Sequence, residues 1–146
     1  MITFNEALRR VERNARLMGT ERVKVCEALG RVLAEDVRAP FPMPIFDNAA
    51  MDGFAFRSVE TKSATAERPA VFEIRGSIRA GDVLKKKLKP AQTTRIMTGA
   101  AIPEGADTVL PKEAAVVRAG KLGVAHPVIS KHIHHRGEEL KKGDKV

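Results

Sequence analysis

Short alternating stretches, separated by turns that contain glycine or proline, constrain the fold of this chain more than any other feature. A stretch that alternates apolar and polar side chains predicts a β-strand with one buried face. The stretches that we expect as strands are residues 54–56, 71–78, 93–97, 108–110, 115–117 and 123–125. The sequence Ala119-Gly120-Lys121 predicts the turn of a hairpin between the last two. Strands spaced about 8–12 residues apart are typical of a small sandwich or barrel, so we expect a compact β unit.

The N-terminal region has a different pattern. Residues 3–19 predict a helix, because the first turn has the spacing of a capping box and apolar residues recur at three- and four-residue spacing. Residues 22–25 and 31–37 predict short strands. We expect Cys26, which lies between them, to be buried in a short helical turn.

Residues 41–57 form the least ordinary segment of the chain. Pro42 and Pro44 interrupt regular structure, and several large apolar side chains stand beside them. A loop with this much apolar surface is expected to pack against the rest of the chain. Packing would hold three polar side chains in fixed directions: Asp47, Asn48 and Asp52. Fixed polar groups on a packed loop are what a binding site requires.

A second candidate segment spans residues 95–107, where a predicted strand enters a turn rich in glycine and proline. Thr98 stands at the end of the strand, and the amides of Gly99 and Ala100 could approach an anion closely, because glycine lacks a β-carbon. For this segment, as for residues 41–57, an ordinary turn is the simpler interpretation.

Three histidines lie close together near the end of the chain. On a strand, His132 and His134 point to the same face, and with Glu138 they could hold a metal ion. Their spacing fixes no third ligand, and ordinary surface histidines explain the pattern equally well. We therefore assign no metal ligand.

The formal net charge is +8, which suits an anionic ligand such as a nucleic acid, a lipid surface or a phosphate-bearing small molecule. The lysine runs at residues 85–89 and 141–142 lack the interleaved aromatic residues that stack on bases, so we expect no nucleic-acid partner. No apolar run reaches the ~18 residues of a membrane span, so we expect no membrane partner. Cys26 is the only cysteine, which favours a reducing cytoplasm.

Four segments together resemble a known family: residues 28–37, 46–57, 95–109 and 136–138. In these segments the chain is similar to the MoeA family, which includes the E domain of gephyrin. The segments occur in the same order as in the family, and the match as a whole extends over nearly the whole chain. The sequence departs from the family at Ala49, where members commonly have serine, and at Phe54, where they have tyrosine. Both changes remove a hydroxyl group.

The resemblance implies an α+β fold that is mainly β. An elongated N-terminal α/β subdomain would comprise residues 1–46 with 128–146, and a compact β-barrel-like subdomain would comprise residues 47–127. The resemblance also implies a homodimer formed through the elongated part. Members continue into a third domain that resembles a molybdopterin adenylyltransferase, and into a fourth β domain. We therefore expect this chain to be the N-terminal part of a longer enzyme and to be inactive alone.

The activity implied by the resemblance is the insertion of molybdate into adenylylated molybdopterin, with release of AMP and with Mg²⁺ as the expected cofactor. The site would be a cleft shared with the third domain of the dimer mate. Asp52 is implied as the catalytic residue, either as a positioner of the metal or as a proton acceptor. The residues implied in binding the anionic pterin phosphate substrate are Asp47, Asn48, Arg95, Thr98 and Gly99.

Two alternatives remain open at this point. The chain could be a non-catalytic dimerisation or scaffold module of the same family. A basic β domain that binds nucleic acid is the weaker alternative.

Overall fold

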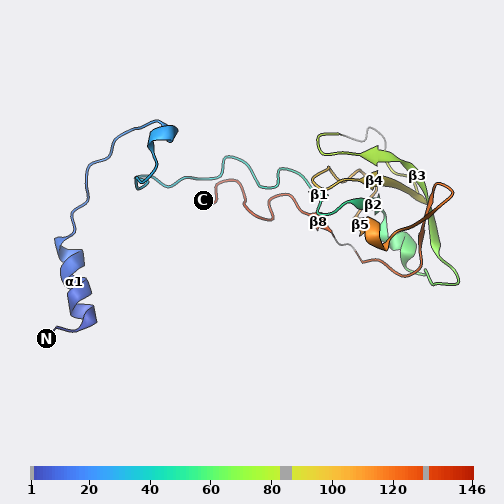
Figure 1. The fold of residues 1–146 in the computed structure, drawn as a ribbon, viewed down its shortest axis with the longest axis horizontal. Coiled ribbons are helices and arrows are strands. Elements are labelled where there is room, and N and C mark those ends of the chain that lie inside the picture. Colours follow the sequence, from blue (N-terminus) through green and yellow to red (C-terminus); the bar gives the residue numbers. More distant parts are fainter. Residues whose placement is uncertain (1, 83–86, 130–131) are drawn as a thin grey trace. The chain divides into compact units, whose positions relative to one another are not determined.

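The computed structural model describes residues 2–82, 87–129 and 132–146 (Figure 1). Lys85 and Lys86 of the first lysine run therefore lie outside the described residues. The chain divides into two compact units, Met1–Asp36 and Val37–Val146. Among the described residues, no helix combines the length and the apolar composition that crossing a membrane requires. The division expected from the family resemblance, with boundaries after residues 46 and 127, stays a prediction.

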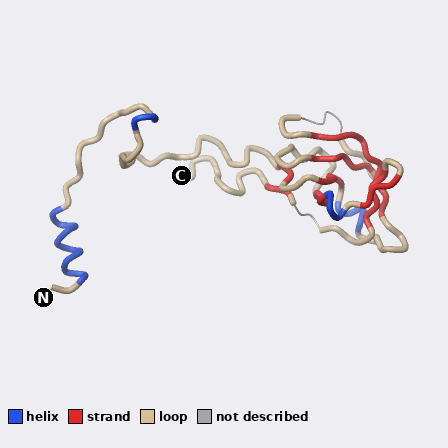
Figure 2. The backbone as a smooth tube through the Cα atoms, in the orientation of Figure 1, coloured by secondary structure: helices blue, strands red, loops and turns tan. Residues whose placement is uncertain are grey.

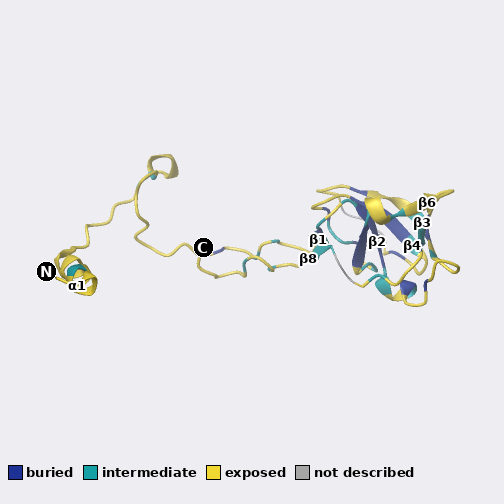
Figure 3. Ribbon diagram, turned by 60° about the horizontal axis from the view of Figure 1, so that its bottom comes forward, coloured by how far each residue is buried: buried dark blue, intermediate teal, exposed yellow. Residues whose placement is uncertain are grey.

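The first unit contains the only α-helix in the described part of the chain, α1 (Phe4–Asn14). The Thr3 hydroxyl oxygen accepts a hydrogen bond from the Glu6 amide at 3.3 Å, so the predicted N-terminal cap is confirmed. No residue of α1 is buried, and Figure 3 colours the helix as exposed and intermediate. The apolar stripe of α1 consists of Phe4, Leu8 and Val11, and all three side chains are exposed. No residue in the described part of the chain covers this stripe.

The helix ends earlier than the sequence predicts. The side-chain amide of Asn14 donates to the carbonyl of Arg10 at 2.8 Å, and Ala15 is already extended. Such a local bond competes with further helical turns. Because no residue of α1 is buried by the described part of the chain, no described tertiary contact stabilises an extension to Gly19.

Two strands predicted in the first unit are absent. Residues 22–25 and 31–37 contain no strand, although the short 3₁₀ helix η1 (Val25–Glu27) confirms the helical turn between them. Cys26 in that turn is exposed, contrary to our expectation. An alternating stretch becomes a strand only when a neighbouring strand bonds its backbone. Among the described residues, the carbonyl of Val37 accepts the amide of Val146 at 2.9 Å, and no strand pairs with the rest of either stretch.

The second unit is built on a six-stranded sheet with the order β5-β2-β4-β3-β7-β6 (Figures 1 and 2). Its strands are β2 (Gly53–Phe56), β3 (Ala70–Ile78), β4 (Gln92–Ile96), β5 (Thr108–Pro111), β6 (Val116–Arg118) and β7 (Lys121–Val124). Only β3 and β4 pair in parallel in this sheet; its other pairs are antiparallel. Two short 3₁₀ helices join strands: η2 (Ser58–Thr61) and η3 (Lys112–Ala114). Each strand predicted for this part of the chain is present, and the α+β, mainly β fold class is confirmed.

A narrow ribbon leads into this sheet. β1 (Asn48–Ala49) pairs antiparallel with β8 (Ile133–His134), and the two strands lie side by side in Figure 1. Isolated bridges continue the antiparallel pairing away from the sheet: Met43–Leu140 and Arg38–Lys145. Residues 37–49 therefore run alongside the last residues of the chain.

β2 is buried on both of its faces and divides the core in two. On one side, Ala55 lies in a cluster of small and aliphatic side chains: Ala49, Ile78, Ile96, Ala100 and Val109. On the other side, Phe54 and Phe56 lie in a larger cluster with Phe72, Leu110, Leu122 and Val124. The rings of Phe56 and Phe72 have centroids 4.7 Å apart. The hydroxyl of Thr93 donates to the carbonyl of Ala55 at 2.8 Å, which satisfies this buried polar group.

The loop within residues 41–57, called the central loop below, does not pack as predicted. Met43, Ile45 and Phe46 are 45%, 56% and 43% exposed, and Met51 is 39% exposed. The prediction that these side chains would anchor the loop is therefore wrong within this chain. Backbone hydrogen bonds fix the loop instead, for example from the amide of Met43 to the carbonyl of Leu140 at 2.8 Å.

Gly53 provides a test of how tightly β2 is enclosed. A Cβ atom added at Gly53 would lie 2.0 Å from the carbonyl oxygen of Leu110, whereas one added at Gly123 would lie 3.7 Å from the carbonyl oxygen of Val116. Overpacking of this kind costs about 1–3 kcal/mol or more. We expect Gly53→Ala to lower the free energy of unfolding of the chain by at least this amount in urea titrations.

The matched control is Gly123→Ala, because Gly123 is also a strand residue without a positive φ. We expect its free energy of unfolding to stay within about 0.5 kcal/mol of the parent. Equal losses in the two variants would show that Gly53 is not held by close backbone approach.

Candidate functional site

Three strand ends meet at one edge of the six-stranded sheet. β2 is antiparallel to both β4 and β5, and Gly53 at its start is opposite Ile96 and Pro111 near their ends. The residues that adjoin these ends are therefore brought together: Asp52, Thr98 and Lys112. The sheet register thus positions the side chains of a candidate site.

Asp52 and Thr98, two of the residues that the family resemblance implied, lie in contact at the centre of this site. One carboxylate oxygen of Asp52, Oδ1, accepts hydrogen bonds from both the amide and the hydroxyl of Thr98, each at 2.9 Å. These two bonds, the amide bond first, hold the pKa of the Asp52 carboxyl below its ordinary value of 3.8. Asp52 is therefore an ionised carboxylate at neutral pH.

Lys112 is a member of the site that the sequence did not reveal. Its ammonium group lies 3.4 Å from Oδ2 of Asp52, and its amide donates to the carbonyl of Asp52 at 3.0 Å. The side chain of Asp52 is 37% exposed and that of Lys112 is 61% exposed, so both remain accessible to a ligand. A basic residue shortly after the strand predicted at residues 108–110 was the available signal, but the strand pairing was needed to recognise it.

A groove with a volume of about 340 Å³ opens at this edge. Asp52, Lys112 and Arg95 line it together with apolar side chains that include Phe54 and Met97. The guanidinium carbon of Arg95 lies 5.9 Å from the centroid of the Phe54 ring, at cation–π distance. The structure thus brings two of the predicted residues, Asp52 and Arg95, to one groove with a second cation.

The turn after Thr98 does not present free amides. The amide of Gly99 donates to the carbonyl of Ala49 at 2.8 Å, and that of Ala100 donates to the carbonyl of Met97 at 3.0 Å. In this conformation these two amides are therefore not free to bind an anion, contrary to the possibility raised from the sequence. Gly99 has a φ of 79°, a backbone conformation that glycine adopts readily. The turn therefore favours glycine at this position. Its assignment to substrate binding stays a prediction.

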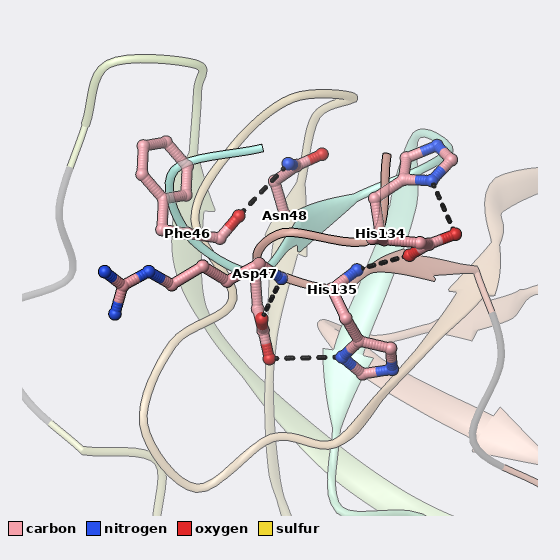
Figure 4. A network of polar contacts seen from close by, with 7 residues as sticks. Phe46, Asp47, Asn48, His134 and His135 are labelled. Carbon is pink, nitrogen blue, oxygen red and sulfur yellow. Dashed lines mark hydrogen bonds and ion pairs between the residues drawn. The ribbon is translucent and has the colours of Figure 1, made fainter. Parts of the chain in front are cut away.

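Asp47 belongs to a separate polar network (Figure 4). Its carboxylate accepts the amide of Arg136 at 2.7 Å and lies 3.2 Å from Nδ1 of His135. The bond from the Arg136 amide, followed by the His135 side chain, holds the pKa of Asp47 below its ordinary value. Asp47 thereby links the central loop to the segment that follows β8, and it does not line the groove at Asp52.

Asn48 and the neighbouring histidines complete this network. The side-chain amide of Asn48 donates to the carbonyl of Phe46 at 3.3 Å, and Asn48 is the strand partner of His134. Glu138 accepts the amide of His135 at 2.6 Å, and its other oxygen lies 3.8 Å from Nδ1 of His134. Within the described residues, no group of three or more histidine, cysteine, aspartate or glutamate side chains is arranged to hold a metal ion.

The hydrogen bonds to Asp52 give a prediction about its titration. Because its folded-state pKa is lowered, ionised Asp52 stabilises the fold above about pH 3.8, and this contribution is lost as the pH falls through the folded-state pKa. Thr98→Ala removes the hydroxyl donor and leaves the amide. We expect the pKa of Asp52, measured from its carboxyl carbon by NMR, to rise toward 3.8 in this variant.

Thr98→Ser is the control, because it keeps the hydroxyl and should leave the titration of Asp52 close to that of the parent. A Thr98→Ala variant with the same Asp52 pKa as Thr98→Ser would contradict a role for the hydroxyl bond.

Comparisons with known proteins give the chain a family. A family model described as the MoeA N-terminal region (domain I and II) matches residues 2–146. The molybdopterin molybdenumtransferase of Bacillus subtilis (strain 168) is 47% identical over 109 residues, which cover 75% of this chain and 25% of that protein. The protein of the same name from Staphylococcus epidermidis is 35% identical over 148 residues, which cover 99% of this chain and 35% of that protein.

A solved structure agrees with the sequence comparisons. The crystal structure of the molybdopterin biosynthesis moeA protein from Pyrococcus horikoshii OT3 matches with a TM-score of 0.87 and 34% identity, over 100% of this chain and 39% of that chain. The chain thus spans between a quarter and two fifths of the length of these relatives. From the family match over residues 2–146, the chain belongs to the MoeA family, where it corresponds to the N-terminal region with domains I and II.

Proposed function

We propose that this chain is the N-terminal, substrate-contacting part of a molybdopterin molybdenumtransferase of molybdenum cofactor biosynthesis, acting in the cytoplasm. The complete protein would insert molybdate into adenylylated molybdopterin and release AMP. The observation that carries the proposal is the ionised Asp52 carboxylate, held by Thr98 at the head of an accessible groove. The names of the relatives support the reaction class.

The charges around the groove suit an anionic substrate. Arg95 and Lys112 both line it, and the chain carries a formal net charge of +8. Cations that converge on a concave surface favour a ligand with several negative charges. Among the described residues that line the groove, Asp52 is the only carboxylate. We propose that it orients the substrate or accepts a proton, while Arg95 binds the phosphate or molybdate oxygens.

Mg²⁺ is the cofactor expected for the complete protein. The donor set in this chain does not fit a dedicated magnesium site, because Asp52 supplies one carboxylate and no described side-chain cluster supplies more. One of its two oxygens already accepts two hydrogen bonds from Thr98. We therefore propose no step in which residues of this chain hold the ion. Likewise, the third domain that completes the cleft is a proposed partner.

A dimerisation role is the second candidate, and the exposure of the first unit favours it. Phe4 and Val11 of α1 are 80% and 68% exposed, and Leu17 is fully exposed. Contiguous exposed apolar surface in a soluble protein marks an interaction site. We propose that a second copy of this chain covers it in a homodimer, either in support of catalysis or as a scaffold without turnover.

The catalytic proposal predicts the behaviour of Asp52 variants. In the complete protein, supplied with adenylylated molybdopterin, molybdate and Mg²⁺, we expect Asp52→Asn to slow AMP release at least about 100-fold, the usual size of a lost proton-transfer group. The 146-residue chain alone should release no AMP, and adding a separately made third domain should restore release.

Asp82→Asn is the matched control, because Asp82 is a turn carboxylate that accepts the Arg79 amide at 3.1 Å outside the groove. It should leave the rate of AMP release unchanged. Parental rates for Asp52→Asn would overturn the catalytic assignment.

The homodimer gives a separate prediction. The double variant Leu8→Glu/Val11→Glu places two charges on the apolar stripe of α1, and we expect it to shift the chain from dimer to monomer in light scattering. Arg9→Glu changes the charge of an exposed α1 residue outside that stripe and should leave the dimer intact. A parent chain that is monomeric at all concentrations tested would refute the interface.

A further inference from the structure

A second cavity, of about 440 Å³, lies beside β6 and β7. It shares Leu110 and Val124 with the core, and it shares none of its lining with the groove at Asp52. The remaining lining is mostly small or apolar, and three basic side chains join it: Arg118, Lys121 and His126. Among the described residues that line this cavity, there is no aspartate or glutamate.

The register of three strands creates a gap in this lining. Gly123 on β7 is opposite Val71 on β3 and Val116 on β6. Residues that are directly opposite share one face of the sheet, so Val71, Gly123 and Val116 lie on the same face. Because Gly123 has no side chain, a gap remains between the two β-branched side chains. Val71 and Val116 are 49% and 55% exposed, and a Cβ atom added at Gly123 would meet only the carbonyl oxygen of Val116, at 3.7 Å.

Charged residues lie on the same face two positions further along the strands. Lys121 is opposite Arg118 on β6 and Glu73 on β3. The carboxylate of Glu73 pairs with Arg75 at 2.7 Å, and within the described part of the chain no ion pair engages Lys121 or Arg118. Two residues along a strand span about 7 Å. The backbone positions of two unpaired cationic residues thus lie about 7 Å along the strands from an open apolar slot.

We propose that this cavity binds a small amphipathic carboxylate. Its apolar body lies over Gly123 between Val71 and Val116, and its carboxylate contacts Lys121 and Arg118. A largely apolar pocket with a few polar groups at one end is the usual form of a small-molecule site, and the absence of lining carboxylates selects an anion over a cation. This site does not depend on the proposed transferase function.

The test is a titration of the ¹⁵N-labelled 146-residue chain with octanoate, and in parallel with octanamide, its neutral isostere. We expect saturable amide shifts centred on residues 71, 116 and 123. Octanoate should bind about three- to tenfold more tightly than octanamide, because exposed charge pairs contribute only modestly. Shifts confined to the exposed apolar residues of the first unit would overturn the proposal.

Two variants separate the apolar slot from the charges. Gly123→Val fills the slot, and we expect it to weaken the binding of both compounds at least tenfold, with an unfolding transition like that of the parent. Arg118→Gln/Lys121→Gln should abolish the preference for octanoate and leave octanamide binding unchanged.

The double variant also tests the proposal if Gly123→Val does not fold. Equal preference for octanoate in the parent and in the double variant would refute it. Shifts at residues 71, 116 and 123 that follow protein concentration without ligand would instead identify a second copy of the chain as the occupant, and would also refute the carboxylate site.

Discussion

The burial of β2 on both faces is the constraint on which the rest of the second unit depends. A strand of four buried residues must have a core on each side, and it has one cluster around Ala55 and another around Phe54 and Phe56. It also separates β4 from β5 in the sheet. Because both neighbours run antiparallel to it, their ends meet at its start. The position of Asp52 beside Thr98 and Lys112 therefore follows from the same arrangement that builds the core.

The site is held by hydrogen bonds to a carboxylate and not by a loop of free amides. Thr98 uses both its amide and its hydroxyl on Asp52, and the amides of the following turn are bonded within the chain. A ligand therefore meets one fixed negative charge flanked by two exposed cationic side chains, Arg95 and Lys112. This distribution of charge orients an anion through its contacts with the cations, and it keeps the carboxylate available for proton transfer.

Sequence patterns correctly predicted those strands that have a neighbouring strand to pair with in the sheet. β3 alternates clearly in sequence, and it and the other predicted strands after residue 53 each pair within the sheet, so local pattern and tertiary structure agree. Residues 31–36 carry a similar pattern, but no strand in the described part of the chain pairs with them, so the pattern alone misled. Lys112 was missed for a related reason, since a surface lysine acquires meaning only through strand register. Exposure of Ile45 and Phe46 shows the same limit, because apolar composition does not say which surface provides the cover.

The ribbon formed by β1 and β8 has a consequence for the order of folding. Asn48 pairs with His134, so a segment made early in synthesis receives its partner only after the whole six-stranded sheet has been made. Contacts of such large sequence separation form late, because the loop between them must first be ordered. The apolar side chains of the segment, Phe41 among them, thus stay without a paired backbone while the nascent chain grows. A chaperone that binds residues 37–49 during translation would therefore cover these apolar side chains until their partner segment has been made.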